Sequence, residues 1–148
     1  RNFNARERVF LTEAELPKEA IDTSCQHDIF PPIEWWQSYI DLVQENKVCV
    51  ANVLGDKSSK PLYWKKMFLT IGGPNWYREF ERMGFKLYDE LFDYSFDSNP
   101  LFEDRWKNIM RQCDKILDMA PLEIERIETI LQPKLEYNAK RIRELAIH

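Results

Sequence analysis

The chain is poor in the residues that build the commonest catalytic and metal sites. Among its 148 residues there are two histidines, His27 and His148, and His27 has no recognisable nucleophile near it in the sequence. A histidine-based catalytic triad and a histidine-rich metal site both combine histidine with further side chains of defined type. We therefore expect neither of them, and we predict no metal site.

Cysteine is also scarce, and long apolar runs are missing. The three cysteines, Cys25, Cys49 and Cys113, are far apart and have neither zinc-type nor redox spacing. We interpret them as reduced and mostly buried, as in cytosolic proteins. The sequence has no run of about 18 apolar residues and no signal-peptide pattern, so we expect a cytoplasmic protein without a membrane span.

Charge and composition narrow the class of protein further. Hydrophobic residues make up 44% of the chain and aromatic residues 14%, which predicts a folded globular protein. A chain of 148 residues is large enough to bury a core but small for a complete two-lobed enzyme. The formal net charge of −4 gives no general attraction to nucleic acid or anionic membranes, so no nucleic-acid partner is expected.

Hydrophobic patterning predicts an α/β fold in which a small parallel sheet of about three strands is flanked by helices. Two long C-terminal helices make the protein helix-rich overall. We expect a single domain over residues 1–148, with an irregular segment over 1–33, a Rossmann-like core over 34–99 and a helical part over 100–148.

The elements of the predicted core follow from local signals. Apolar residues recur at helical spacing from Glu34 to about Glu45, which predicts a helix. β-branched or apolar runs predict strands over 47–54, 67–71 and 85–88. A short helix over 58–66, with Pro61 in its first turn, is expected between the first two strands.

Proline and glycine mark the ends of the later elements. A helix over 75–83 is expected to end at Gly84, and residues 89–99 are expected to form an acidic-aromatic loop. Two amphipathic helices then begin after Pro100 and at Pro121. Pro133 predicts a kink in the second of them.

The Gly72-Gly73-Pro74 turn is the first candidate ligand site. A strand, a glycine turn and a helix N-terminus are together a common way of binding phosphate, because glycine lets the backbone approach and the helix offers unpaired N–H groups. Pro74 removes one of those donors, and the pattern matches neither the dinucleotide fingerprint nor the Walker loop. By itself the pattern favours the alternative, a tight strand-to-helix turn.

The second candidate is the charged turn that contains Asp56, Lys57 and Lys60. It follows a predicted strand, so its side chains are expected at the carboxyl edge of the sheet, where open α/β folds bind ligands. A carboxylate there could accept hydrogen bonds from ribose hydroxyls, and a lysine could neutralise a diphosphate. The alternative is a solvated charged turn, which one basic turn does not exclude.

The carboxylates of the loop over 89–99 are the third candidate. Closely spaced carboxylates can hold a divalent cation or act as acid and base. They can equally cap the helix after Pro100 and pair with Lys86 or Arg105, and their spacing does not match an EF-hand. We favour the structural role.

Five segments in a fixed order carry a family resemblance. They are WQSYIDLVQE over 36–45, DKSSKP over 56–61, MFLTIGGP over 67–74, GFKLY over 84–88 and FDYSFD over 92–97. In this order they resemble uncharacterised proteins common in phages and large DNA viruses, whose C-terminal portion is similar to the nucleotide-sugar half of GT-B glycosyltransferases, including fucosyltransferase-like ones. The likeness covers about half of the chain.

This resemblance implies a nucleotide-sugar-binding half-domain that is incomplete as a catalyst on its own. It implies that Asp56 contacts ribose, that Lys57 contacts the diphosphate with assistance from Lys60, and that Gly72 and Gly73 admit the backbone to the ligand. The implied ligand is a nucleotide sugar as donor substrate, and the implied partner is a second domain or a separate protein. The implied location is the cytoplasm, which is the host cytoplasm if the protein is viral. The alternative is a non-enzymatic interaction or virion-associated domain that kept the fold and lost the chemistry.

Overall fold

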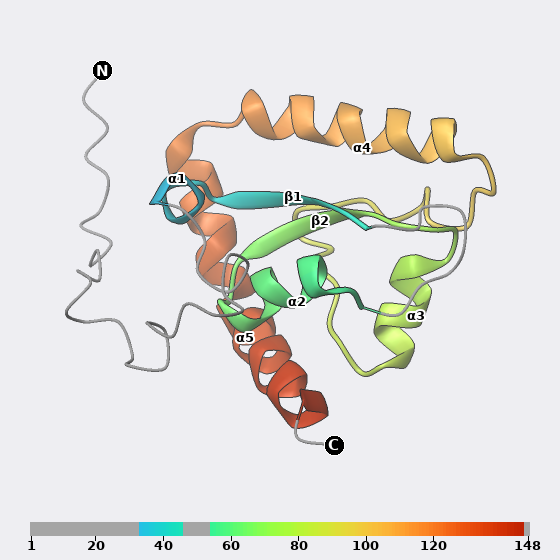
Figure 1. Ribbon diagram of the computed structural model, residues 1–148. Coiled ribbons are helices and arrows are strands. Elements are labelled where there is room, and N and C mark those ends of the chain that lie inside the picture. Colours follow the sequence, from blue (N-terminus) through green and yellow to red (C-terminus); the bar gives the residue numbers. More distant parts are fainter. Residues whose placement is uncertain (1–32, 46–53, 147–148) are drawn as a thin grey trace. The chain divides into compact units, whose positions relative to one another are not determined.

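The computed structural model describes residues 33–45 and 54–146 (Figure 1). The chain divides into two units, Arg1–Trp36 and Gln37–His148. The first described helix, α1 (Ile33–Gln37), spans this boundary, and its Trp35 and Trp36 rings meet edge to face with centroids 5.0 Å apart. The expectation of a single domain over 1–148 stays a prediction.

The second unit is an α/β arrangement around two parallel strands, β1 (Ile40–Gln44) and β2 (Met67–Ile71). Ile40 pairs with Met67 at one end of the sheet and Gln44 with Ile71 at the other. The helices of this unit are α2 (Asp56–Tyr63), α3 (Trp76–Arg82), α4 (Phe102–Leu117) and α5 (Pro121–Ala146). The predicted class, a helix-rich α/β fold with a small parallel sheet and two long C-terminal helices, is confirmed.

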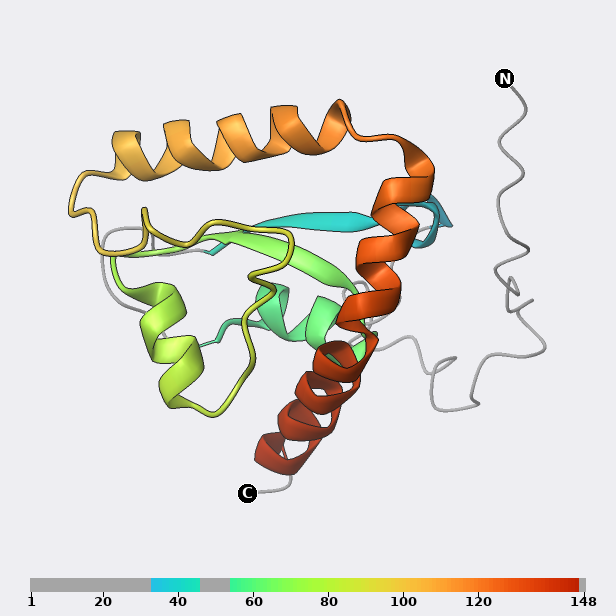
Figure 2. The same ribbon diagram turned by 180° about the vertical axis from the view of Figure 1, so that it is seen from behind.

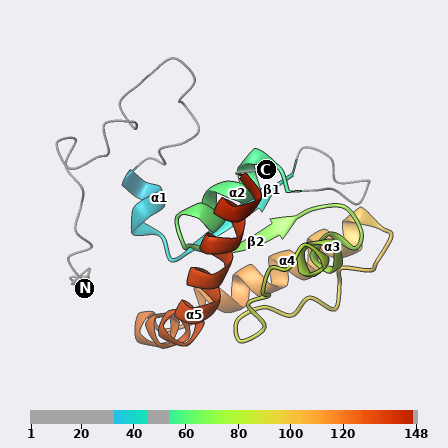
Figure 3. The same ribbon diagram turned by 90° about the horizontal axis from the view of Figure 1, so that it is seen from below.

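The helices cover both faces of the strand pair. In Figures 1 and 2, α4 lies on one side of the strands and α2 on the other. Seen from below, α2 also lies against α5 (Figure 3). Parallel strands are normally covered on both faces and are therefore mostly apolar, and β2 is apolar except for Thr70. All five of its residues are buried, as predicted for 67–71.

The predicted helix from Glu34 to about Glu45 is wrong. The helix α1 ends at Gln37, and the chain then forms strand β1. Ile40 and Val43 are β-branched and suit a strand, and the pairing with β2 satisfies the backbone. That ladder continues one residue beyond the strand, where the Glu45 N–H donates to the Ile71 carbonyl at 3.1 Å. Over these five residues, strand pairing favours β structure more strongly than the helical spacing of the apolar residues favours a helix.

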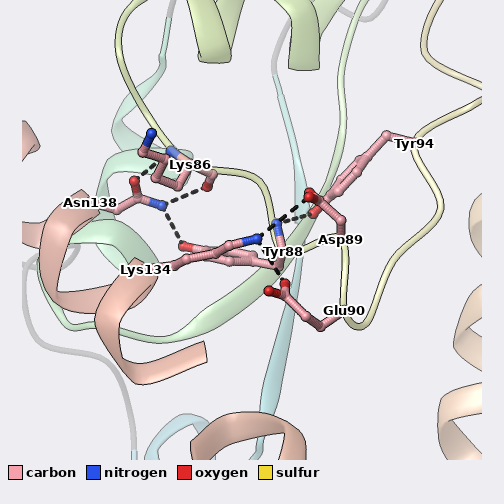
Figure 4. A network of polar contacts seen from close by, with 7 residues as sticks. All are labelled: Lys86, Tyr88, Asp89, Glu90, Tyr94, Lys134 and Asn138. Carbon is pink, nitrogen blue, oxygen red and sulfur yellow. Dashed lines mark hydrogen bonds and ion pairs between the residues drawn. The ribbon is translucent and has the colours of Figure 1, made fainter. Parts of the chain in front are cut away.

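The predicted third strand over 85–88 is also wrong, because a side chain takes the place of a neighbouring strand. The Lys86 N–H donates to Asn138 Oδ1 at 2.8 Å, and Asn138 Nδ2 donates to the Lys86 carbonyl at 2.8 Å (Figure 4). The described residues therefore hold two strands, against the predicted three. The predicted strand over 47–54 lies outside the described residues except for Leu54, which is not in a strand.

The other helices differ from prediction mainly at their ends. The helix α2 begins at Asp56, before the predicted 58–66, so that Pro61 lies in its second half and not in its first turn. The helix α3 ends as predicted, with Gly84 at a φ of 91°, a left-handed value that favours glycine. Helices α4 and α5 match the predicted pair, and α5 continues past Pro133 to Ala146. The loop over 89–99 contains no helix or strand, as predicted.

Candidate functional site

The two predicted groups of ligand-binding residues lie at the same edge of the sheet. The strands β1 and β2 run parallel, so their carboxyl ends meet there. Gly72 and Gly73 directly follow β2. The start of α2, with Asp56, Lys57 and Lys60, is joined to the end of β1 through Glu45. This edge is where open α/β sheets bind ligands.

Glu45 holds the start of α2, a role that the sequence did not indicate. Its side chain is buried, with 4% of its surface exposed. The carboxylate accepts a hydrogen bond from the Gly55 N–H at 3.3 Å and another from the Ser58 hydroxyl. An anion at the start of a helix meets the positive end of the helix dipole. The first turn of α2 is therefore stabilised from within the protein.

The lysines of α2 remain on the outside of this arrangement. Lys57 is exposed and Lys60 is half-buried, whereas the Asp56 side chain lies outside the described part of the structure. Within residues 33–45 and 54–146, no carboxylate forms an ion pair with either lysine. The ammonium group of Lys57 is thus open to an anion from solvent.

The glycine turn is closed by protein side chains. Gly72 is buried, and the Trp76 ring packs against it so tightly that an added Cβ would lie 2.6 Å from Trp76 Cγ. The Gly73 carbonyl, also in a buried residue, accepts the Trp76 N–H at 3.2 Å. Glycine is therefore required at position 72 for the packing of Trp76, whether or not a ligand approaches the turn.

The first N–H groups of α3 are bound by Asp97. The Tyr77 N–H donates to one carboxylate oxygen at 3.1 Å and the Arg78 N–H to the other at 3.0 Å. The Asn75 N–H donates to the Asp97 carbonyl at 2.7 Å. Burial raises the pKa of the Asp97 carboxyl, although these N–H groups and Arg105 act to lower it. Asp97 thus caps α3, whereas the sequence suggested a cap for the helix after Pro100.

Arg105 ties the glycine turn to the start of α4. Its side chain is buried, with 2% exposed, although arginine is seldom buried without partners. The guanidinium donates to the carbonyls of Asn99 at 2.7 Å, Pro100 at 3.1 Å and Gly72 at 3.3 Å. The bond to Gly72 fixes a carbonyl of the turn, whereas Asp97 binds N–H groups of the residues that follow the turn.

The other loop carboxylates have structural partners as well. Asp89 and Glu90 pair with Lys134 of α5, at 3.5 and 2.9 Å, and not with Lys86 (Figure 4). The N–H and hydroxyl of Ser95 hold the pKa of the Asp93 carboxyl below its usual range. No group of three or more histidine, cysteine or acidic residues in the described ranges is arranged to hold a metal ion.

An open hollow of about 570 Å³ lies beside this loop, and Glu81, Glu90, Asp93 and Tyr94 are among the residues that line it. Carboxylates of the third candidate, the loop over 89–99, therefore line this hollow, whereas Asp56, Lys57, Lys60, Gly72 and Gly73 do not. The hollow is thus separate from the predicted nucleotide-sugar site.

Comparison with known proteins assigns no family to the chain. No family model, no curated protein and no solved structure matches it. Among the described residues, no helix is both long enough and apolar enough to cross a membrane. The chemistry of the carboxyl edge is therefore the evidence from which a function can be argued.

Proposed function

We propose that the chain is the nucleotide-sugar-binding half of a GT-B-like glycosyltransferase, incomplete as a catalyst on its own. The observation that carries the proposal is the position of Lys57, exposed and without an ion pair in the described ranges, at the carboxyl edge of a parallel strand pair. Ligands of open α/β folds bind at that edge, and ammonium groups bind phosphate.

The proposal gives each residue of the edge a separate role. Lys57 binds the diphosphate, Lys60 assists from the next turn of α2, and Asp56 accepts hydrogen bonds from the ribose hydroxyls. Gly72 and Gly73 form the neighbouring wall of the site, with Trp76 filling the space beside Gly72. Because Asp97 binds the first N–H groups of α3, the diphosphate depends on the lysines and not on that helix start.

Titration calorimetry with UDP-sugars and GDP-sugars, with and without Mn²⁺, tests the proposal. We expect one nucleotide class to bind, and Lys57→Ala to weaken that binding about tenfold, the loss of one charge-assisted contact. Lys107→Ala is the matched control, because Lys107 is an exposed lysine of α4 that pairs with Glu103. Failure of every nucleotide sugar to bind the intact chain, or equal binding by Lys57→Ala, would overturn the proposal.

A non-enzymatic interaction or virion-associated domain is the second candidate function, and one face of α5 favours it. Leu122, Ile130 and Tyr137 are 59%, 61% and 45% exposed. They are spaced by eight and seven residues, about two helical turns each, so they lie on one side of the helix. Exposed apolar side chains aligned in this way suit a partner surface. Light scattering after size exclusion tests it: a complex disrupted by Ile130→Glu supports the surface, and a strict monomer without partner contradicts it.

A further inference from the structure

We infer that Glu45 is the positioning residue of the proposed site, because it fixes the first turn of α2 to the end of β1 and so places Lys57 at the sheet edge. The effect of Glu45 on ligand binding rests on the proposed function, whereas its contacts with β2 and α2 are present without any ligand. Glu45 lies at the junction of three elements, β1, β2 and α2.

The main chain and the side chain of Glu45 act on different neighbours. Its N–H donates to the Ile71 carbonyl at 3.1 Å, which anchors the residue in the sheet. Its carboxylate reaches Gly55 and Ser58, which are the residues on either side of Asp56 and Lys57. The backbone of Lys57 is therefore held between two hydrogen bonds to one buried carboxylate.

Gly55 is part of the same arrangement. A Cβ at this position would overlap the Glu45 carboxylate, so a glycine is needed for the side chain to approach the backbone N–H. Ser58 is fully buried, with 0% exposed, and its hydroxyl loses its acceptor when Glu45 is truncated to alanine. Leaving a buried donor unpaired is costly, and the first turn of α2 can relieve that cost by moving.

Glu45 acts through α2 and not on the ligand. Its side chain is turned into the protein, with 4% exposed, and its charge has the same sign as a phosphate. The effect of removing it therefore reaches a bound diphosphate through the position of Lys57. This separates Glu45 from Asp56, Lys57 and Lys60, which the proposed function assigns to direct contact with the ligand.

Four variants test the inference. Glu45→Ala removes both hydrogen bonds, whereas Glu45→Gln keeps an acceptor oxygen for Gly55 and Ser58. Ser58→Ala removes one bond without changing the strand and serves as the milder variant. Glu103→Ala is the charge-matched control, because its carboxylate is 77% exposed on α4.

Each variant is measured in two ways, at a temperature where it is fully folded. Hydrogen exchange of the amides over 55–59 reports the order of α2 without any ligand, and calorimetry reports the affinity for the UDP-sugar or GDP-sugar that binds best. We expect Glu45→Ala to exchange about tenfold faster over 55–59 and to bind about tenfold more weakly, and Glu45→Gln to stay within about twofold of the unmodified chain. Ser58→Ala should fall between them.

Two results would overturn the inference. Unchanged exchange over 55–59 in Glu45→Ala would show that the carboxylate does not order α2. Faster exchange with unchanged affinity would show that Glu45 stabilises the helix without positioning Lys57. If the unmodified chain binds no nucleotide sugar, the proposed function fails, and the exchange measurement alone decides whether Glu45 orders α2.

Discussion

Two helices, α2 and α3, begin at the carboxyl edge of the sheet. Both starts were candidate phosphate sites from the sequence, but their contacts within the protein differ. Each start is approached by a buried carboxylate, Glu45 at α2 and Asp97 at α3. At α3 the carboxylate binds two successive N–H groups, and at α2 it leaves Lys57 on the outside. In this protein, the glycine turn before α3 is therefore weaker evidence for a phosphate site than Lys57. Lys57 has no ion pair in the described ranges, and the nearby Glu45 carboxylate is bound by Gly55 and Ser58.

The α3 side of this edge, which comprises the glycine turn and the start of α3, has further contacts within the protein. The Tyr77 hydroxyl bonds both the N–H and the carbonyl of Thr70, and so closes the outer edge of β2. The Trp76 ring stacks on Phe80 at 5.2 Å and covers Gly72. The contacts of the α3 side therefore stabilise the fold, and the α2 side is the one for which we propose ligand binding.

Alkaline pH should produce the largest loss of stability, and the part of it that is due to Tyr77 should be traceable to α3. Burial raises the pKa of Tyr77, Tyr88 and Tyr94 above the usual range. The phenols are neutral in both states below about pH 10, and above it only the unfolded chain releases their protons, so stability falls as pH rises. We expect a loss of about 4 kcal/mol between pH 9 and pH 11 from the three phenols together, measured by urea unfolding.

Tyr77→Phe is the matching variant. It should reduce that pH dependence by about one proton, although it also removes the bonds to Thr70. An unfolding free energy that stays constant from pH 9 to pH 11 would contradict the burial of these phenols.

The next largest effect is expected from Asp97→Ala. It removes the acceptor for the N–H groups of Tyr77 and Arg78 and leaves the buried Arg105 without its nearby carboxylate. We expect the free energy of unfolding to fall by about 3 kcal/mol, the sum of a lost cap and unpaired buried groups. A loss below about 1 kcal/mol would show that Asp97 is not the main cap of α3.

Gly72→Ala separates packing from ligand approach. The added methyl group overlaps the Trp76 ring, so we expect the free energy of unfolding to fall by about 2 kcal/mol without any ligand present. Urea denaturation provides the measurement. Unchanged stability combined with lost nucleotide binding would instead assign the glycine to the ligand.

The sequence predicts a helix or strand well when the signals that form it are local. It fails when the hydrogen-bond partner of a segment lies far away along the chain. The strand β2 and the end of α3 at Gly84 were predictable, because an apolar run and a left-handed glycine are local signals. The segment over 85–88 was not, because its backbone partner is Asn138, which is 52 residues from Lys86. Strand β1 was missed because its apolar residues also fit a helical period over so short a window.

The residues of the candidate site show the same difference between local and distant signals. Lys57 and Lys60 were predicted to bind a ligand from their charge and from their place after a predicted strand. They lie in α2, whose start is at the carboxyl edge of the sheet, and their binding role stays a prediction. Glu45 and Asp97 could not be assigned, because a cap supplied from another segment requires the fold to be known. Lys57 could be selected from the sequence by its charge and its place in the chain. The roles of the two carboxylates depend on contacts with residues ten and twenty positions away.

Lys57→Ala should have the smallest effect on stability. Its side chain is exposed and has no ion pair in the described ranges, so the free energy of unfolding should change by less than about 0.5 kcal/mol. Urea unfolding beside Asp97→Ala compares the two helix starts directly. A loss comparable with that of Asp97→Ala would mean that Lys57 supports the fold.

The most direct test of the difference between the two helix starts is amide chemical-shift mapping of the chain with the nucleotide sugar that binds best. We expect the largest shifts over residues 55–60, at the start of α2, and small shifts over 76–78, whose N–H groups include the two bound by Asp97. Shifts concentrated over 76–78, or the absence of shifts with every UDP-sugar and GDP-sugar, would contradict it.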